Sequence, residues 1–88
     1  MKITAVRIHP DDNVVNLLRD HAKGERPNAA EGPLIPLTSA IPMGHKSALL
    51  AVAKGAPVVK YGAIIGRASM AISPGDHVHL HNLEGDTP

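Results

Sequence analysis

Three histidines alternate with apolar residues near the end of the chain, in the tract His77–Val78–His79–Leu80–His81. Successive side chains of a β-strand point to opposite faces. A strand here therefore places the three imidazoles on one face, and Val78 and Leu80 on the other. Histidine titrates near neutral pH and is a common metal ligand. The tract therefore indicates a metal site or a site of proton transfer, and the pattern alone does not separate the two. The alternative is an exposed strand face that merely carries polar residues.

A second polar group, Gly44–His45–Lys46, follows a proline and sits next to a glycine turn. A neutral imidazole beside an ammonium group suits an anionic substrate, because the lysine attracts the anion while the histidine acts as a base. An ordinary solvated turn is the competing interpretation. The residues that we expect in acid–base or metal-proximal roles are His45, His79 and His81. Those that we expect to bind substrate are Lys46, Lys60, Arg67 and Asn82.

These side chains must be positioned by strands rather than helices. The chain of 88 residues contains eight glycines and eight prolines, spread along its length, and both residues disfavour helix interiors. The expected strands are residues 3–8, 58–61, 63–65 and 78–83. Residues 14–18 fit either a strand or one amphipathic turn, because periodicity alone cannot decide for so short a run.

Residues 47–54 have helical propensity, and Gly55 would be a good helix C-cap; the alternative is a strand inside a compact barrel. The stretch 23–33 is expected to be a loop. A turn centred on glycine recurs at Gly24, Gly55 and Gly75, with an irregular period. The sequence therefore predicts an all-β, barrel-like small domain over residues 1–88, with one or two short helical turns near residues 47–53.

Composition limits the function classes. The only aromatic residue is Tyr61, and a small aliphatic core in so short a chain is only marginally stable, which indicates a subunit completed by a larger partner. The net charge is +1 without a basic run, so no nucleic-acid partner is expected. No apolar run approaches the ~20 residues that span a bilayer, so we expect no membrane association and a cytoplasmic location. Cysteine is absent, which excludes thiolate ligands.

Four motifs together resemble the SAF-type β-clip domain of the altronate/galactarate dehydratase family. They cover nearly the whole chain: Ile8-His9-Pro10-x-Asp12-Asn13-Val14, Ile41-Pro42-x-Gly44-His45-Lys46-x-Ala48-Leu49, Gly55-x-x-Val58-x-Lys60-Tyr61-Gly62-x-x-Ile65-Gly66-x-Ala68 and Gly75-x-x-Val78-His79-x-His81-Asn82. His77 falls at a position that the family pattern leaves open, so it is expected to matter least of the three histidines.

The resemblance implies a β-clip fold and the removal of water from a sugar acid such as altronate or galactarate. It also implies a divalent metal, commonly iron, bound mainly by a large catalytic subunit, without which this chain is expected to be inactive. Two alternatives stay open. The chain is similar to the small subunit of sulfolactate sulfo-lyases, and β-clip modules also serve as non-catalytic anion- or carbohydrate-binding domains.

Overall fold

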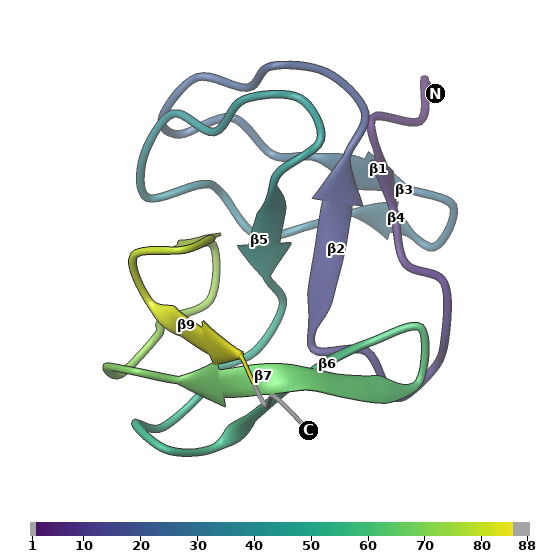
Figure 1. Cartoon of the computed structure of the whole chain (residues 1–88). Coiled ribbons are helices and arrows are strands. Elements are labelled where there is room, and N and C mark those ends of the chain that lie inside the picture. The colour runs from purple at the N-terminus through teal and green to yellow at the C-terminus, as the bar shows by residue number, and fades with distance from the viewer. Residues whose placement is uncertain (1, 86–88) are drawn as a thin grey trace.

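The computed structural model describes residues 2–85, and this part of the chain is built from strands and turns alone. The strands are β1 (Ala5–Val6), β2 (Val14–Leu17), β3 (Asn28–Ala29), β4 (Gly32–Pro33), β5 (Lys46–Ala48), β6 (Pro57–Lys60), β7 (Ala63–Ala68), β8 (His77–Val78) and β9 (Leu83–Gly85). They form one four-stranded sheet, β1-β2-β5-β8, one three-stranded sheet, β6-β7-β9, and the β3-β4 hairpin. In Figure 1 the long strand β7 crosses below the ends of β2 and β5. The all-β prediction is confirmed.

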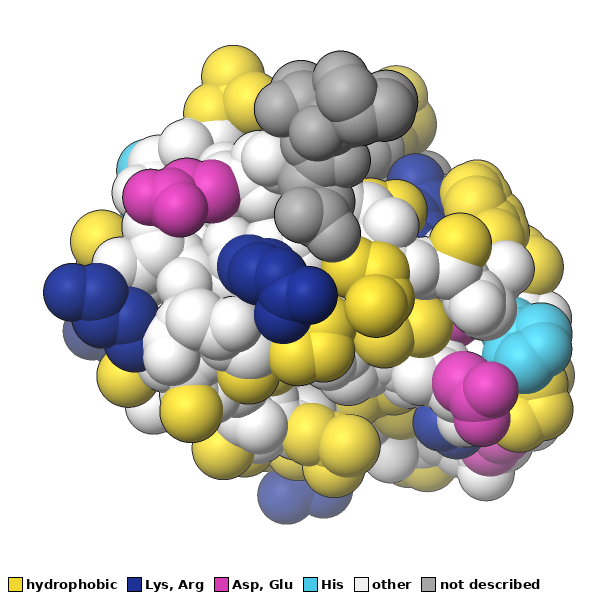
Figure 2. Space-filling model, turned by 60° about the horizontal axis from the view of Figure 1, so that its bottom comes forward, with side chains coloured by type: hydrophobic (Ala, Val, Ile, Leu, Met, Phe, Trp, Pro, Cys, Tyr) yellow, Lys and Arg dark blue, Asp and Glu magenta, His cyan; other side chains and the backbone are white. Residues whose placement is uncertain are grey.

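The four-stranded sheet is antiparallel throughout and is covered on both faces. Val14 and Val15 are neighbours on β2 and therefore point to opposite faces; each is only 1% exposed and each belongs to a different apolar cluster. Both clusters consist of small aliphatic side chains, while Tyr61 is 54% exposed. The core therefore has the small aliphatic character that the composition predicts. Figure 2 shows further hydrophobic side chains on the surface, among scattered charged ones.

The expected helical turns near residues 47–53 are absent from the described chain. Strand β5 occupies the start of this segment, and Val52 forms an isolated bridge with Ile72. Ser47 and Ala48 are buried, so their backbone groups are paired across the sheet, and this pairing outweighs a weak local helix propensity. The described strands do not close into a barrel. The segment 23–33, expected to be a loop, contains the short β3-β4 hairpin. No helix in residues 2–85 is long and apolar enough to cross a membrane.

The hairpin of β6 and β7 turns through two residues, Tyr61 and Gly62, with φ of 57° and 72°. Two consecutive positive φ values are the pattern of a type I′ turn, whose twist matches that of the flanking strands. Tyr61 occupies this left-handed conformation although glycine or asparagine is usual there. Gly66 lies on β7 where β9 passes closely: a Cβ atom would lie 2.3 Å from the backbone oxygen of Glu84. Glycine at position 66 therefore permits β9 to pass close to β7.

The recurring glycine turn is more regular than the sequence analysis suggested. Gly24, Gly44, Gly55 and Gly75 have φ between 84° and 87°, and a backbone hydrogen bond closes each four-residue turn around them, as in type II turns. Gly55 follows Gly24, and Gly75 follows Gly44, by 31 residues each. The surrounding backbone bonds repeat with the same offset: His21 pairs with Ile41 as Val52 pairs with Ile72. Residues 17–45 and 48–76 are therefore two copies of one backbone pattern.

Asp12 joins the turn after β1 to the β6-β7 hairpin. Its carboxylate is 2% exposed and accepts hydrogen bonds from the backbone N–H of Gly62 (2.8 Å) and of His9 (3.1 Å). Burial raises the pKa of Asp12, but the backbone donors of Gly62, His9, Tyr61 and Ile8 together outweigh it and lower the pKa below the ordinary value. A carboxylate held in this way fixes the left-handed turn at Tyr61.

Asp12→Asn is expected to destabilise the fold by about 1–3 kcal/mol at pH 7, because an amide nitrogen cannot accept from one of the two backbone donors. The folded-state pKa of Asp12 is depressed, so its contribution is present above the unfolded pKa and is lost as the pH falls through the folded value. Urea unfolding between pH 7 and pH 2 should therefore show a smaller loss of stability in acid for Asp12→Asn than for the wild type. Asp11→Asn, at the exposed neighbouring position, is the matched control. Equal behaviour of the two variants would contradict the role of Asp12.

Candidate functional site

The histidine tract forms a short strand followed by a turn. Only His77 and Val78 belong to β8, and residues 79–82 turn back toward β9. Val78 is fully buried as expected, but Leu80 is 82% exposed. The expectation that Leu80 packs beneath the strand is wrong, because the alternation of faces ends where the strand ends.

The cluster nevertheless forms, because β5 and β8 are paired. Lys46 lies opposite Val78, and Ser47 lies opposite His77. Continuing this register by one residue sets His45 opposite His79 on the same face as His77. Directly opposed side chains of an antiparallel pair are close neighbours. The sheet thus brings together two motifs that lie more than thirty residues apart in the sequence.

The imidazole rings of this cluster are in close contact. The ring centroids of His45 and His79 are 3.9 Å apart with an interplanar angle of 17°, and those of His45 and His77 are 5.0 Å apart. His45 Nδ1 and His77 Nε2 are 2.8 Å apart, so one of them carries a proton and donates it to the other. One ligand nitrogen from each of His45, His77 and His79 lies within 4.8 Å of the other two. We call these three residues the histidine triad.

The electrostatics favour neutral rings at His77 and His79. Burial, followed by the positive charge of His45 and its neighbours, lowers the pKa of His77 below its ordinary value. For His79 the pKa is likewise lowered, first by burial and then by His45, Lys46 and His81. A neutral imidazole retains a lone pair, and it is the form that accepts a proton or binds a metal.

Asn82 holds the turn that presents His79. Its side-chain amide donates to the carbonyl of His77 (2.8 Å) and accepts from the backbone N–H of His79 (3.0 Å). The side chain is 4% exposed, and both of its polar atoms are engaged with backbone. The geometry therefore gives Asn82 a positioning role in this turn, and the substrate contact expected from the sequence stays a prediction. His9 and Asp12 form the same type of turn at the other end of the chain.

Lys46 follows His45 on β5, so its side chain points to the opposite face of the sheet, and its ammonium interacts electrostatically with that of Lys60. Burial lowers the pKa of Lys46, and the positive charge of Lys60 lowers it further. The ammonium of Lys60 lies 4.7 Å from the ring centre of Tyr61. Two lysines in a partly buried setting repel each other, and a bound anion would relieve that repulsion.

Sequence reasoning missed Asn16, which completes this group. Asn16 lies opposite Lys46 in the β2-β5 pair, and its amide nitrogen donates to the hydroxyl of Tyr61 at 3.5 Å. Its side-chain oxygen is buried and has no hydrogen-bond partner among the described residues. Buried polar atoms are normally paired, so this oxygen is available to a donor from a ligand. The only signal in the sequence is a single polar residue inside the apolar run of residues 14–18.

The other site residues expected from the sequence, His81, Arg67 and Lys60, lie at different distances from the histidine triad. The ring of His81 is 5.2 Å from that of His77 and tilted by 49°, and the residue is exposed. Arg67 is on β7, opposite Pro57, and donates to the carbonyl of Gly55 at 3.3 Å. Lys60 pairs with Ala63 at the turn end of the same hairpin. Arg67 therefore lies at the other end of the hairpin from the lysine pair, roughly 10 Å away along the strands.

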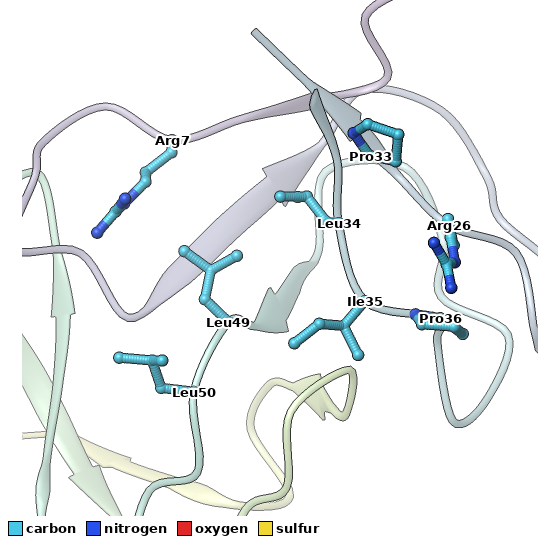
Figure 3. A pocket seen from close by; sticks show the side chains of 8 residues that line it. All are labelled: Arg7, Arg26, Pro33, Leu34, Ile35, Pro36, Leu49 and Leu50. Carbon is cyan, nitrogen blue, oxygen red and sulfur yellow. The ribbon is translucent and has the colours of Figure 1, made fainter. Parts of the chain in front are cut away.

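An apolar hollow of about 420 Å³ lies away from the triad. Leu49 and Leu50, which follow β5, face Leu34 and Ile35, which follow β4, and Arg7 and Arg26 lie at opposite sides (Figure 3). Leu50 is 59% exposed and Ile35 is 40% exposed. We call this surface the apolar groove.

The all-β fold and the clustered histidine motifs agree with the protein family that the sequence matches. Residues 3–86 match the altronate/galactarate dehydratase SAF domain, and the chain belongs to this family. It is 47% identical over 79 residues to an altronate dehydratase of Bacillus subtilis (strain 168), covering 90% of this chain and 16% of that protein. It is 43% identical over 77 residues to an altronate dehydratase of Escherichia coli (strain K12), covering 88% of this chain and 15% of that protein.

A relative of a second kind is much shorter. The chain is 47% identical over 45 residues to the subunit alpha of a (2R)-sulfolactate sulfo-lyase from Chromohalobacter salexigens, covering 51% of this chain and 48% of that subunit. The chain thus spans less than a fifth of the altronate dehydratases that it matches, and about half of this subunit. The recognition of the family from its motifs is confirmed.

Proposed function

We propose that this chain is the small subunit of a sugar-acid dehydratase of the altronate type. The observation that carries the proposal is the histidine triad, in a chain that is 47% identical to an altronate dehydratase over 90% of its length. The domain spans residues 1–88, acts in the cytoplasm and requires a large catalytic subunit. Its site supplies neutral imidazoles and ammonium groups to an anionic substrate.

Elimination of water from a hydroxy acid requires two proton transfers. A base removes the proton next to the carboxylate, and an acid protonates the departing hydroxyl. A neutral imidazole that is not bound to a metal suits the first step, and an imidazolium suits the second. Lys46 and Lys60 bind the carboxylate of the substrate. The unpaired oxygen of Asn16 and the hydroxyl of Tyr61 are the groups that we propose bind a hydroxyl of the sugar acid.

The divalent metal that the family implies fits the donors present. Three imidazole nitrogens within 4.8 Å of one another form a donor set that iron, zinc and similar ions accept. When bound, such an ion supplies Lewis acidity to a carboxylate or hydroxyl oxygen of the substrate. The residues of this chain that would hold it are His45, His77 and His79.

The half-exposed site and the apolar groove both support a larger partner. Catalysis of this kind needs a site closed to water, whereas Leu80 and His81 beside the triad are exposed. The altronate dehydratases that resemble this chain continue for more than four fifths of their length outside the matched region. We infer that the catalytic part of the enzyme covers the apolar groove.

The partner assignment is tested by co-purification. Leu50→Asp places a charge among Leu34, Ile35 and Leu49 and is expected to abolish recovery of the large subunit with a tagged small subunit, because burying an unpaired carboxylate is strongly unfavourable. Met70→Asp is the control, since Met70 is similarly exposed (49%) and lies outside the groove. Undiminished recovery with Leu50→Asp would place the partner interface elsewhere.

The activity itself is tested by reconstitution. The chain alone is expected to show no turnover of altronate, galactarate or sulfolactate, and the complex to dehydrate altronate. If the complex turned over sulfolactate but neither sugar acid, it would be a sulfo-lyase. The likeness to subunit alpha supports this second candidate function. No turnover of any of the three by a stable complex would favour a non-catalytic anion- or carbohydrate-binding module.

A further inference from the structure

We infer that this small domain binds a divalent transition-metal ion by itself, through His45, His77 and His79. The inference deepens the proposed function but rests on the geometry of the triad alone. It differs from the expectation drawn from the sequence, in which the partner subunit holds most of the metal ligands and His77 matters least.

The separation of the nitrogens is the first argument. Nitrogen ligands lie about 2.1 Å from zinc, so two of them on one tetrahedral or octahedral ion are about 3.0–3.5 Å apart. His45 Nδ1 and His77 Nε2 are already 2.8 Å apart. The nitrogen of His79 lies within 4.8 Å of both, so small side-chain rotations bring all three to bonding distance. An ion takes the place of the proton that His45 and His77 share.

The second argument is that the backbone of the triad is rigidly placed. His45 follows the type II turn at Gly44, whose closing bond is 3.2 Å long. His77 lies in β8 opposite Ser47, and the amide of Asn82 clamps the backbone of His79. A site built on paired strands and a closed turn is largely preformed, so binding the ion requires little ordering of the chain.

The donor set defines the class of ion. Three imidazoles without a thiolate or a carboxylate suit Fe²⁺, Co²⁺, Ni²⁺ or Zn²⁺ rather than Mg²⁺ or Ca²⁺, which prefer oxygen. Three protein ligands leave further coordination positions open, as in catalytic metal sites. His81 lies outside the triad, with its ring 5.2 Å from that of His77, and remains free to transfer a proton.

The test uses Co²⁺ and Zn²⁺ with the 88-residue chain in the absence of any partner. Visible absorption of Co²⁺ and calorimetry with Zn²⁺ should show one ion per chain. Each of His45→Ala, His77→Ala and His79→Ala should weaken binding by about tenfold or more, since even outer-shell changes reach that size. His9→Ala removes an imidazole elsewhere and should leave the affinity within about twofold of the wild type, as should His81→Ala.

Measurements on the unmodified chain keep the result independent of the folding of the variants. Zn²⁺ should shift the imidazole resonances of His45, His77 and His79, leave those of His9 and His21 in place, and raise the melting temperature by preferential binding to the folded chain. The inference is overturned if no ion binds, if His9→Ala weakens binding as much as the triad variants do, or if the shifted resonances belong to other histidines. Because activity is not measured, failure here leaves the proposed dehydratase function standing.

Discussion

His79→Ala is expected to lower the turnover number of the reconstituted enzyme by roughly 100-fold or more, the usual scale for the loss of a general acid or base. His79 stacks on His45 at 3.9 Å, and Asn82 holds its backbone, so the side chain is placed for a defined role. Steady-state kinetics on the substrate that the complex accepts gives the measurement, with thermal melts to verify folding.

Two comparisons identify what His79 does. If His79 is a metal ligand, excess Fe²⁺ or Co²⁺ should restore part of the activity of His79→Ala, and His77→Ala should be similarly impaired. If it transfers a proton instead, added metal should have no effect, and His77→Ala should stay within a few-fold of the wild type, as the sequence pattern predicts. His9→Ala is the control in both experiments. Near-wild-type turnover for both His79→Ala and His81→Ala would move the chemistry to the partner subunit.

The sequence predicted the fold class well because glycine and proline act locally. Turn glycines at Gly24, Gly55 and Gly75 were recognised, and all have the positive φ that the turn requires. The prediction of a helical turn near residues 47–53 was wrong because tertiary context overrides intrinsic helix propensity, even that of Ala and Leu. The burial of Ser47 and Ala48 between β2 and β8 is a tertiary effect.

The internal repeat is present in the sequence, but the spacing of the three turn glycines Gly24, Gly55 and Gly75 does not reveal it. Gly24, Gly55 and Gly75 alone are spaced irregularly, because the counterpart of Gly75 is Gly44. With it, the interval of 31 residues is plain. The two copies differ where the site is: His45 occupies the place that Asp76 has in the second copy. Asp76 accepts the backbone N–H of Ser73 and thus closes its turn, whereas His45 faces His77 and His79.

The site could be predicted in part. Each histidine motif is recognisable in the sequence. That the two motifs lie side by side depends on the register of β5 against β8, which no local sequence pattern contains. The sequence predicts that His77 matters least of the three histidines, because the family pattern leaves its position open. In the structure, however, His77 Nε2 lies only 2.8 Å from His45 Nδ1. Asn16 was missed because one polar residue in an apolar strand has no distinctive signature; its unpaired oxygen is evident only in three dimensions.

Lys46→Met is expected to raise KM by about tenfold to a hundredfold while kcat changes only a few-fold. Methionine keeps the apolar stem that packs in the partly buried position and removes the charge. A charged hydrogen bond contributes about 1.5–3 kcal/mol, and a carboxylate contact present in both ground and transition states acts as uniform binding. Lys60→Met should also raise KM, because the charge of Lys60 acts on Lys46.

The control for this prediction is Lys54→Met, which removes an exposed lysine from the turn before Gly55 and should leave both constants unchanged. A fall in kcat at constant KM for Lys46→Met would contradict uniform binding. It would mean that the ammonium acts only as charge develops on the substrate. The lowered pKa of Lys46 makes that alternative chemically meaningful, because a lysine whose charged form is destabilised gives up its proton more easily. The split between KM and kcat therefore decides whether Lys46 holds the substrate or takes part in its conversion.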